Sequence, residues 1–153
     1  MADFVITHDG GIVEYRLTRP ESRNSLTFAM YQALEDLCRD PGGANVIVLT
    51  AEGDKAFASG TDISNFKDFD SAQDAIDYES MIGRVIDAVQ TAVVPVIASL
   101  HGIVAGGGAA IAAAAASAIA AAAATALLPV SWRLLLLRSP PHFLGDHHSS
   151  TFF

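Results

Sequence analysis

Two short segments of small residues each follow a strand-like apolar run and could do chemistry through their main chains. The first is Ala58-Ser59-Gly60-Thr61-Asp62-Ile63, and the second is Gly102-Ile103-Val104-Ala105-Gly106-Gly107-Gly108. Backbone N–H groups from two such turns, aimed at one carbonyl oxygen, would stabilise the negative charge that this oxygen gains as a thioester becomes an enolate. The two segments therefore predict an oxyanion hole and chemistry on an acyl thioester.

A group for proton transfer is missing beside the second segment, because no Asp, Glu, Lys or Arg occurs between Asp87 and Arg133. General acid–base chemistry needs such a side chain within hydrogen-bond reach of the substrate. The glycine triplet also lacks the Lys-Ser/Thr of a nucleotide-phosphate loop and the third glycine of a dinucleotide fingerprint, so neither is expected. The sequence shows groups that would bind a carbonyl, but none that would move the proton.

The composition narrows the class of partner. At 153 residues and 51% hydrophobic, the chain has the length of one domain with a buried core. A formal net charge of −8 disfavours nucleic acid or an anionic membrane as the main partner. The single cysteine, Cys38, excludes an intramolecular disulfide and is expected to lie in the core in a reducing compartment. The first residues show no basic segment followed by an apolar run, so we expect no secretory signal and a cytoplasmic location.

The strand and helix patterns alternate along the chain. Apolar runs at residues 4–7 and 12–18, split by Asp9-Gly10-Gly11, predict a β-hairpin. A helix is predicted from Leu26 to Leu37, ended by Asp40-Pro41-Gly42-Gly43. The β-branched run Val46-Ile47-Val48-Leu49 is typical of a central strand buried on both faces.

The second half of the chain continues this order. A capping box of Ser71 and Asp74 predicts the start of a helix, whose apolar stripe consists of Tyr78, Met81, Ile82, Val85, Ile86 and Val89. A strand is expected over residues 96–100, then the glycine loop, then an alanine-rich helix over residues 109–124 with Ile111 and Ile119 as its only large apolar side chains. This alternation predicts an α/β fold.

The end of the chain has a different character. We expect a core domain over residues 1–126 and an unassigned tail over residues 127–153. The alanine block is either a true alanine-rich helix or a region whose side chains were never identified and were written as alanine. A further alternative is a membrane span from Gly102 to Ser131, which carries no charge. The tail also holds the residue types of a metal site, although such clusters often bind nothing: His142, Asp146, His147 and His148.

Three ordered motifs resemble the crotonase superfamily, which includes enoyl-CoA hydratases and isomerases. Arg19-Pro20 with Asn24-Ser25-Leu26 is similar to the Arg-Pro…Asn-Ala-Leu entry to the family's first helix. The stretch from Lys55 to Ile63 is similar to Lys-Ala-Phe-x-Ala-Gly-Ala-Asp-Ile. Pro95-Val96-Ile97-Ala98, His101-Gly102 and the glycine triplet complete the match, which runs from about Phe4 to Ala113. The resemblance implies a crotonase-like spiral of ββα units, truncated at the C-terminal side.

The resemblance also implies roles for individual residues. The N–H groups of Thr61 and Gly107 would hold the thioester oxygen of an acyl-CoA from fatty acid metabolism, and Arg23 would approach the CoA phosphates. CoA would be part of the substrate, with no separate cofactor, and the protein would be a homotrimer or hexamer. The complete set of implied substrate-binding residues is Arg23, Ser59, Gly60, Thr61, Asp62, Ile63, Ser64, Gly106 and Gly107.

The chain departs from the family at the catalytic carboxylates. In the hydratases a Glu lies two residues after the glycine triplet, where this chain has Ala110, and a second Glu aligns with Val130. Alanine cannot activate the water that adds to a double bond. Three hypotheses follow: an enoyl-CoA hydratase or isomerase, a degenerate module that binds acyl-CoA without turnover, and a small membrane protein.

Other candidates are better explained by structure than by catalysis. Asp62 is expected to accept backbone N–H bonds and fix its loop, and His101 to be a hydrogen-bonded residue at a strand end. Asp74, Asp77 and Glu79 are expected on the solvated side of their helix.

Overall fold

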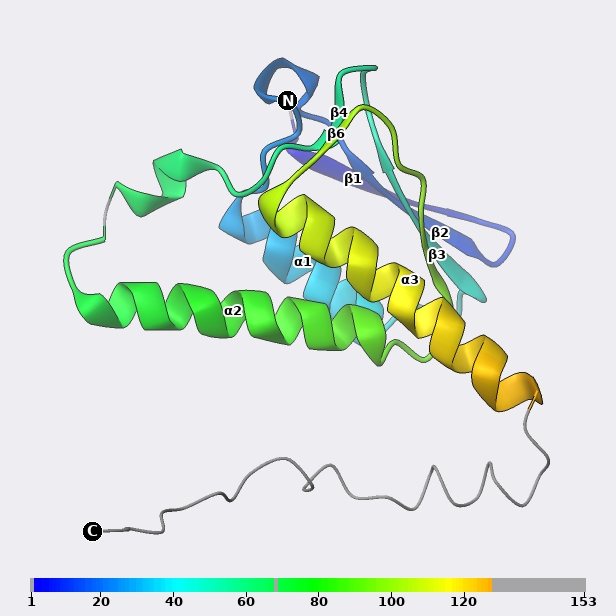
Figure 1. The fold of residues 1–153 in the computed structure, drawn as a ribbon. Helices are drawn as coiled ribbons and strands as arrows, with labels where there is room; N and C mark the ends of the chain where they lie inside the picture. The colour runs from blue at the N-terminus through cyan, green and yellow to red at the C-terminus, as the bar shows by residue number, and fades with distance from the viewer. Residues whose placement is uncertain (1, 68, 128–153) are drawn as a thin grey trace, which may run out of the picture. The chain divides into compact units, whose positions relative to one another are not determined.

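The chain forms three successive ββα units (Figure 1). The computed structural model describes residues 2–67 and 69–127, of which residues 2–121 belong to one compact unit. The first unit comprises β1 (Phe4–Asp9), β2 (Ile12–Leu17) and α1 (Phe28–Arg39). The second comprises β3 (Val46–Ala51), β4 (Ala56–Ala58) and α2 (Ala72–Gln90), and the third β5 (Val96–Ala98), β6 (Ile103–Val104) and α3 (Gly106–Leu127). Two 3₁₀ turns, η1 (Pro20–Ser22) and η2 (Ile63–Phe66), lie in the connections.

The main sheet has the strand order β1-β2-β3-β5. β1 and β2 are antiparallel and turn at Gly10 and Gly11, both at positive φ, which confirms the predicted hairpin. β3 runs parallel to both β2 and β5 and is therefore internal, as its sequence indicates. β5 ends at Ala98, two residues before the predicted end of this strand.

Within the part of the chain that the structure describes, β4 and β6 form a second sheet that the sequence pattern did not predict. These strands pair in parallel, with Ala56 opposite Ile103 and Ala58 opposite Val104. The prediction of one continuous loop over residues 102–108 was therefore wrong. Ile103 and Val104 form a strand because the Lys55 carbonyl accepts the Ile103 N–H at 2.9 Å, a partner nearly fifty residues away that no local pattern shows.

The helices begin where their caps place them, with one exception. The Ser71 hydroxyl accepts the Asp74 N–H, and the Asp74 carboxylate accepts the Ser71 N–H at 2.9 Å, which confirms the capping box of α2. α3 was expected to begin after the glycine triplet, but it begins at Gly106, so the triplet forms its first turn. Glycines there lower helix propensity, and their presence needs a packing reason.

One hydrophobic core joins the main sheet to all three helices. Val13, Tyr15 and Leu17 of β2 and Ile47 and Leu49 of β3 face it. The helices contribute to the same core, which also holds the predicted Cys38: Met30, Tyr31, Leu34, Leu37 and Cys38 of α1, Val85, Ala88 and Val89 of α2, and Ile111, Ala114 and Ala115 of α3. Burial raises the pKa of the Cys38 thiol to about 12, as expected for a core residue.

Only one face of β3 is fully buried. Ile47 and Leu49 are buried, whereas Val46 and Val48 on the other face are half-buried, so the expectation of burial on both faces was wrong. The reason is that this second face also carries polar side chains, since the Thr50 hydroxyl donates to Glu14 of β2 at 2.7 Å. Buried and half-buried side chains therefore alternate along β3 from Val46 to Thr50.

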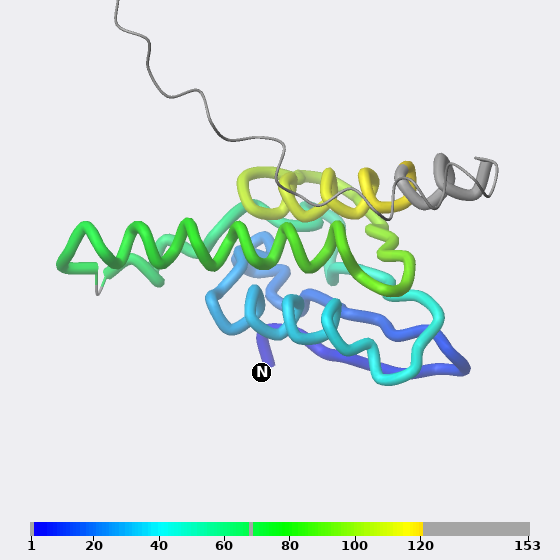
Figure 2. Tube along the Cα trace, turned by 90° about the horizontal axis from the view of Figure 1, so that it is seen from below, coloured from blue at the N-terminus to red at the C-terminus, as the bar shows by residue number. Residues whose placement is uncertain are grey.

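The helices are also tied to one another by charge. The carboxylate of Glu35 on α1 is buried and binds Arg39 on the same helix, with Nη2 and Oε1 2.9 Å apart. Its second oxygen lies 3.6 Å from Nε of Arg84 on α2. The N-terminal half of α2 extends past α1 and runs beside the η2 segment (Figures 1 and 2). No helix among residues 2–67 and 69–127 has the length and apolar character needed to cross a bilayer.

We predict different losses of stability for two glycine substitutions with matched backbone geometry. Gly10 and Gly102 both have a φ of 56°, but a Cβ at Gly10 meets nothing within 4 Å, whereas a Cβ at Gly102 would overlap the Lys55 carbonyl. Gly10→Ala should lower the free energy of unfolding by about 1 to 2 kcal/mol through left-handed strain. Gly102→Ala should cost about 2 kcal/mol more, because the backbone of β4 or β6 must move.

Urea denaturation of both variants measures the difference. Equal losses in the two variants would contradict the close approach between Lys55 and Gly102.

Candidate active site

The two small-residue segments leave the same end of the small sheet. β4 leads into Ser59-Gly60-Thr61, and β6 leads through Ala105 into α3. Because β4 and β6 are parallel, their carboxyl ends meet at one edge, the usual place for ligands in α/β proteins. The Ala58 carbonyl accepts the Ala105 N–H at 3.0 Å and joins the two segments directly.

The glycines allow the two backbones to approach closely. A Cβ at Gly106 would lie 3.2 Å from the Gly60 Cα, and a Cβ at Gly108 would lie 2.5 Å from the Ala58 Cβ. A Cβ at Gly107 would overlap the Tyr31 hydroxyl. A side chain at Gly108 would push α3 away from β4, and one at Gly107 would displace the Tyr31 hydroxyl, which explains these glycines in the first turn of α3.

The main-chain amides of Thr61 and Gly107 have no backbone acceptor within the described part of the chain. Thr61 sits opposite Leu26 in a parallel bridge, in which the Gly60 carbonyl accepts the Leu26 N–H at 2.8 Å and the Asp62 N–H donates to the Leu26 carbonyl at 2.9 Å. The N–H of Thr61 must then point to the side away from Leu26. Gly107 lies in the first turn of α3, where N–H groups have no intrahelical partner and the helix dipole is positive.

Asp62 fixes the first segment. Its Oδ1 accepts the Ser64 N–H at 2.9 Å and the Ser64 hydroxyl at 2.7 Å, and its Oδ2 lies 2.8 Å from Nη2 of Arg19. The bonds from Ser64 and from Arg19 hold the pKa of Asp62 at about 2, below its ordinary value. This geometry agrees with the structural role expected from the sequence.

Asn24 fixes the loop that carries Arg19. Its side chain is buried, accepts the Arg19 N–H at 2.9 Å, and donates to the carbonyls of Glu52 and Ala56 at 2.9 and 2.8 Å. These three bonds hold Asn24 itself in a left-handed conformation, with a φ of 53°. The Arg-Pro…Asn motif is thus a clamp between the first loop and β4.

The remaining implied binding residues lie on both sides of this segment. The Arg23 carbonyl accepts the Ser59 N–H at 3.1 Å, and the Arg23 side chain is exposed. Ile63 is 83% exposed at the start of η2, beside the exposed Ser64. The structure therefore gathers all the implied residues around the ends of β4 and β6, on the loop, on η2 and on the first turn of α3.

The sequence analysis did not place Tyr31 or Tyr78 at this site, but both lie beside Thr61. The Thr61 hydroxyl lies 2.8 Å from the Tyr31 hydroxyl of α1 and 2.8 Å from the Tyr78 hydroxyl of α2. Tyr78 was placed in the apolar stripe of its helix and Tyr31 was not singled out. No spacing rule connects residues 31, 61 and 78, because only the tertiary fold brings the two helices to the loop.

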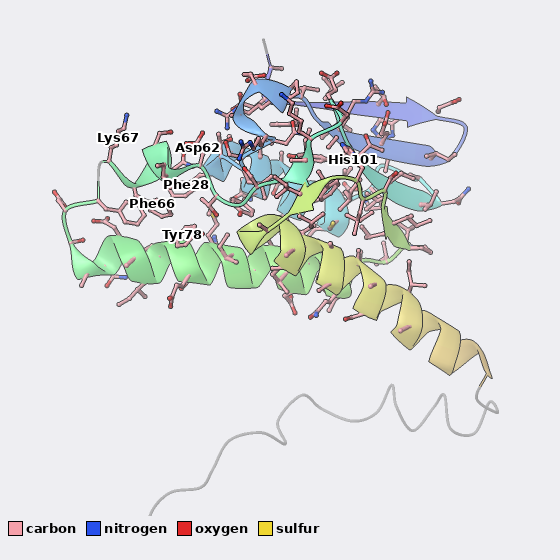
Figure 3. All side chains as sticks on the ribbon, turned by 45° about the horizontal axis from the view of Figure 1, so that its top comes forward. Phe28, Asp62, Phe66, Lys67, Tyr78 and His101 are labelled. Atoms are coloured by element: carbon pink, nitrogen blue, oxygen red, sulfur yellow. The ribbon has the colours of Figure 1, made fainter. Side chains whose placement is uncertain are left out.

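An aromatic cluster borders Tyr78. Phe28, Phe66 and Tyr78 are mutual neighbours, with ring centroids 5.0 to 6.1 Å apart (Figure 3). A groove of about 320 Å³ lies along this cluster. Its lining consists of Phe28, Phe69, Asp74, Asp77, Tyr78, Met81 and Arg84. An apolar wall with a few polar groups is typical of a pocket for an organic ligand.

Other candidate residues take no clear part. Nε2 of His101 is buried without a hydrogen-bond partner among the described residues, so the expected structural bond on this nitrogen is absent. Asp74 caps α2, and Asp77 and Glu79 are exposed, as predicted. Ala110 is half-buried on α3. The described residues hold no cluster suited to a metal ion, and His142, Asp146, His147 and His148 lie outside them.

Comparison with known proteins finds one family model and several relatives whose sequences are similar to this chain. Residues 7–131 match the family model described as enoyl-CoA hydratase/isomerase. The chain is 31% identical over 111 residues to the mitochondrial 3-hydroxyisobutyryl-CoA hydrolase of Gallus gallus, covering 69% of this chain and 29% of that protein. It is 36% identical over 66 residues to enoyl-CoA delta isomerase 2 of Rattus norvegicus, covering 40% and 16%. The chain thus spans less than a third of these curated relatives.

Solved structures show the same fold. An enoyl-CoA hydratase from Bacillus anthracis superposes with a TM-score of 0.66 at 26% identity, covering 74% of this chain and 45% of that one. An enoyl-CoA hydratase from Mycobacterium smegmatis gives a TM-score of 0.60 at 31% identity, covering 68% and 42%. The expected crotonase-like fold is confirmed.

We predict that the anchor at Asp62 contributes stability that depends on pH. The folded pKa of about 2 lies below the ordinary 3.8, so the contribution is complete above about pH 5 and is lost as the pH falls toward 2. Asp62→Asn should lower the free energy of unfolding by about 1 to 2 kcal/mol at pH 6, and the gap to the unmodified protein should narrow to about a third of that value by pH 2.5.

Urea denaturation across this pH range measures the gap. Asp87→Asn, at an exposed position on α2, is the control and should show little difference at any pH. A gap for Asp62→Asn that stays constant down to pH 2.5 would contradict the role of the charge.

Proposed function

Because the chain belongs to the enoyl-CoA hydratase/isomerase family, we propose that it binds an acyl-CoA and stabilises the thioester enolate with the amides of Thr61 and Gly107. The observation that carries this proposal is that both amides lack a backbone acceptor among residues 2–67 and 69–127, on segments joined through Ala58 and Ala105. Approach of Gly106 to Gly60 brings the two segments close together. A carbonyl oxygen between them would receive both hydrogen bonds.

Such a pair of donors favours the enolate over the ground-state thioester. Charge moves onto the oxygen as the enolate forms, and donors already fixed in place need no reorganisation at that moment. Thr61 is fixed through the neighbouring bonds of Gly60 and Asp62 to Leu26, and Gly107 through the first turn of α3. Loss of one such donor typically costs about 3 kcal/mol of transition-state stabilisation.

The CoA portion would lie over the segment from Ser59 to Ser64. Ile63 presents an apolar side chain that is 83% exposed, and bound CoA would cover it. The exposed guanidinium of Arg23 would contact the phosphates, where a charge-assisted hydrogen bond is strong. In a chain with a net charge of −8, this local cation matters for holding an anionic ligand.

Family membership supports further proposals about the working protein. CoA would enter as part of the substrate, no separate cofactor would be required, and a homotrimer or hexamer in the cytoplasm would be the working form. Neither nucleic acid nor a membrane is proposed as a partner, because the acidic surface would repel both.

A second candidate function is binding of acyl-CoA without turnover. Two features of the sequence favour it. Ala110 stands where the resemblance to the family's hydratases leads one to expect a Glu, and no Asp, Glu, Lys or Arg occurs between Asp87 and Arg133. Without a positioned acid or base, the site would polarise a thioester but not complete hydration.

Two measurements on the full chain test the proposal and separate the candidates. Calorimetry should show that butyryl-CoA binds more tightly than free CoA, because the carbonyl gains two hydrogen bonds. An active enzyme should reduce the conjugated thioester absorbance of crotonyl-CoA by hydration, or raise that of 3-hexenoyl-CoA by isomerisation. Binding with neither spectral change would support the second candidate, and no binding of butyryl-CoA would overturn the acyl-CoA proposal.

A further inference from the structure

Three hydroxyl groups form a chain at the proposed oxyanion site. The Tyr31 hydroxyl on α1 and the Tyr78 hydroxyl on α2 each lie 2.8 Å from the Thr61 Oγ1 on the loop between them. These two bonds are the side-chain hydrogen bonds that the structure shows for the three hydroxyls within its described residues. The Tyr31 hydroxyl also occupies the space beside Gly107, so this chain of hydroxyls reaches both small-residue segments of the site.

The number of hydroxyl protons determines which group donates in each of these two hydrogen bonds. Three hydroxyls carry three protons, and the two bonds use only two of them. Tyr31 is 1% exposed, and an unpaired O–H buried at that depth costs free energy that a bond to Thr61 removes. Burial also raises the pKa of Tyr31, which keeps its proton in place as a donor. Tyr31 therefore donates to Thr61.

The third proton, which neither bond uses, then lies on the hydroxyl of Tyr78. When Thr61 accepts from Tyr31 and donates to Tyr78, each bond polarises the next, and the O–H of Tyr78 is left without an acceptor. Tyr78 is half-buried, unlike Tyr31, and lines the groove beside Phe28 and Phe69. Its ring is held by Phe28 and Phe66, with centroids 5.7 and 5.0 Å away (Figure 3).

We propose that Tyr78 donates a hydrogen bond to the acyl group of the substrate, so that the site selects acyl-CoA thioesters bearing an oxygen acceptor on the acyl chain. This inference rests on the proposed function, because it assumes that the thioester carbonyl lies at Thr61 and Gly107. Because Tyr78 bonds to Thr61 and also lines the groove, an acyl chain that runs from this carbonyl toward α2 would pass the Tyr78 hydroxyl before the aromatic wall. A plain hydrocarbon chain would leave the donor unpaired and would bind less well.

The charges around the groove favour an uncharged acceptor. Asp74 and Asp77 line the groove and would repel a carboxylate on the acyl chain. The lining cation, Arg84, faces the buried carboxylate of Glu35 at 3.6 Å. The preferred substrates are therefore hydroxyacyl or oxoacyl thioesters rather than dicarboxylic ones.

Calorimetry with a matched pair of ligands tests the inference on the full chain. Butyryl-CoA and 3-hydroxybutyryl-CoA, the latter as both enantiomers, have the same chain length and differ by one hydroxyl. The unmodified protein should bind one hydroxybutyryl enantiomer about tenfold more tightly than butyryl-CoA. In Tyr78→Phe, which keeps the ring, this ratio of affinities should fall to about one.

Further variants separate the hydroxyl chain from general effects. Thr61→Val removes the central hydroxyl but keeps the main-chain N–H, so the ratio should fall, and Thr61→Ser should restore it. Ser80→Ala removes an exposed hydroxyl from the same helix and should leave the tenfold ratio intact. Equal binding of both ligands by the unmodified protein, or a preference that persists in Tyr78→Phe, would overturn this inference alone. Failure of both ligands to bind would overturn the proposed function together with the inference that rests on it.

Discussion

The close approach of two backbones is the constraint on which the site depends. The turn after β4 and the start of α3 come within contact distance, where a Cβ at Gly108 would overlap Ala58 and one at Gly106 would lie 3.2 Å from the Gly60 Cα. Gly106 lies against Gly60, Gly108 against Ala58, and Gly107 against the Tyr31 hydroxyl. Glycine in the first turn weakens α3 locally, so the fold gives up helix propensity where α3 begins close to the turn after β4.

Buried polar groups hold the approaching segments in position. Asn24 bonds to three main-chain groups and clamps the first loop to β4, while Asp62 joins Ser64 and Arg19 on the other side of Thr61. The Gly60 carbonyl and the Asp62 N–H are both bonded to Leu26, which turns the intervening Thr61 N–H away from Leu26. The same arrangement that leaves this amide free also places the Thr61 side chain between two tyrosines.

Local patterns predicted most elements, but not the small sheet or the hydroxyl chain. The hairpin, the internal strand and the capped α2 follow from turn residues, hydrophobic spacing and caps. β4 and β6 are three and two residues long and exist only because they pair with each other across nearly fifty residues. Tyr31 and Tyr78 have ordinary helical positions, and their contact with Thr61 depends on how α1 and α2 pack. Sequence motifs indicated the candidate backbone donors, whereas the contacts of the two tyrosines with Thr61 required the tertiary structure.

The central claim is that the amides at Thr61 and Gly107 converge on one thioester oxygen, and isotope-edited infrared spectroscopy tests it directly. The carbonyl stretch of butyryl-CoA labelled with ¹³C at the thioester carbon would be recorded in water and bound to the full chain. Two fixed donors polarise the C=O bond, so the account predicts that the bound stretch moves to lower frequency than in water. A bound stretch at the frequency found in water, or at a higher frequency as in an apolar pocket, would contradict it.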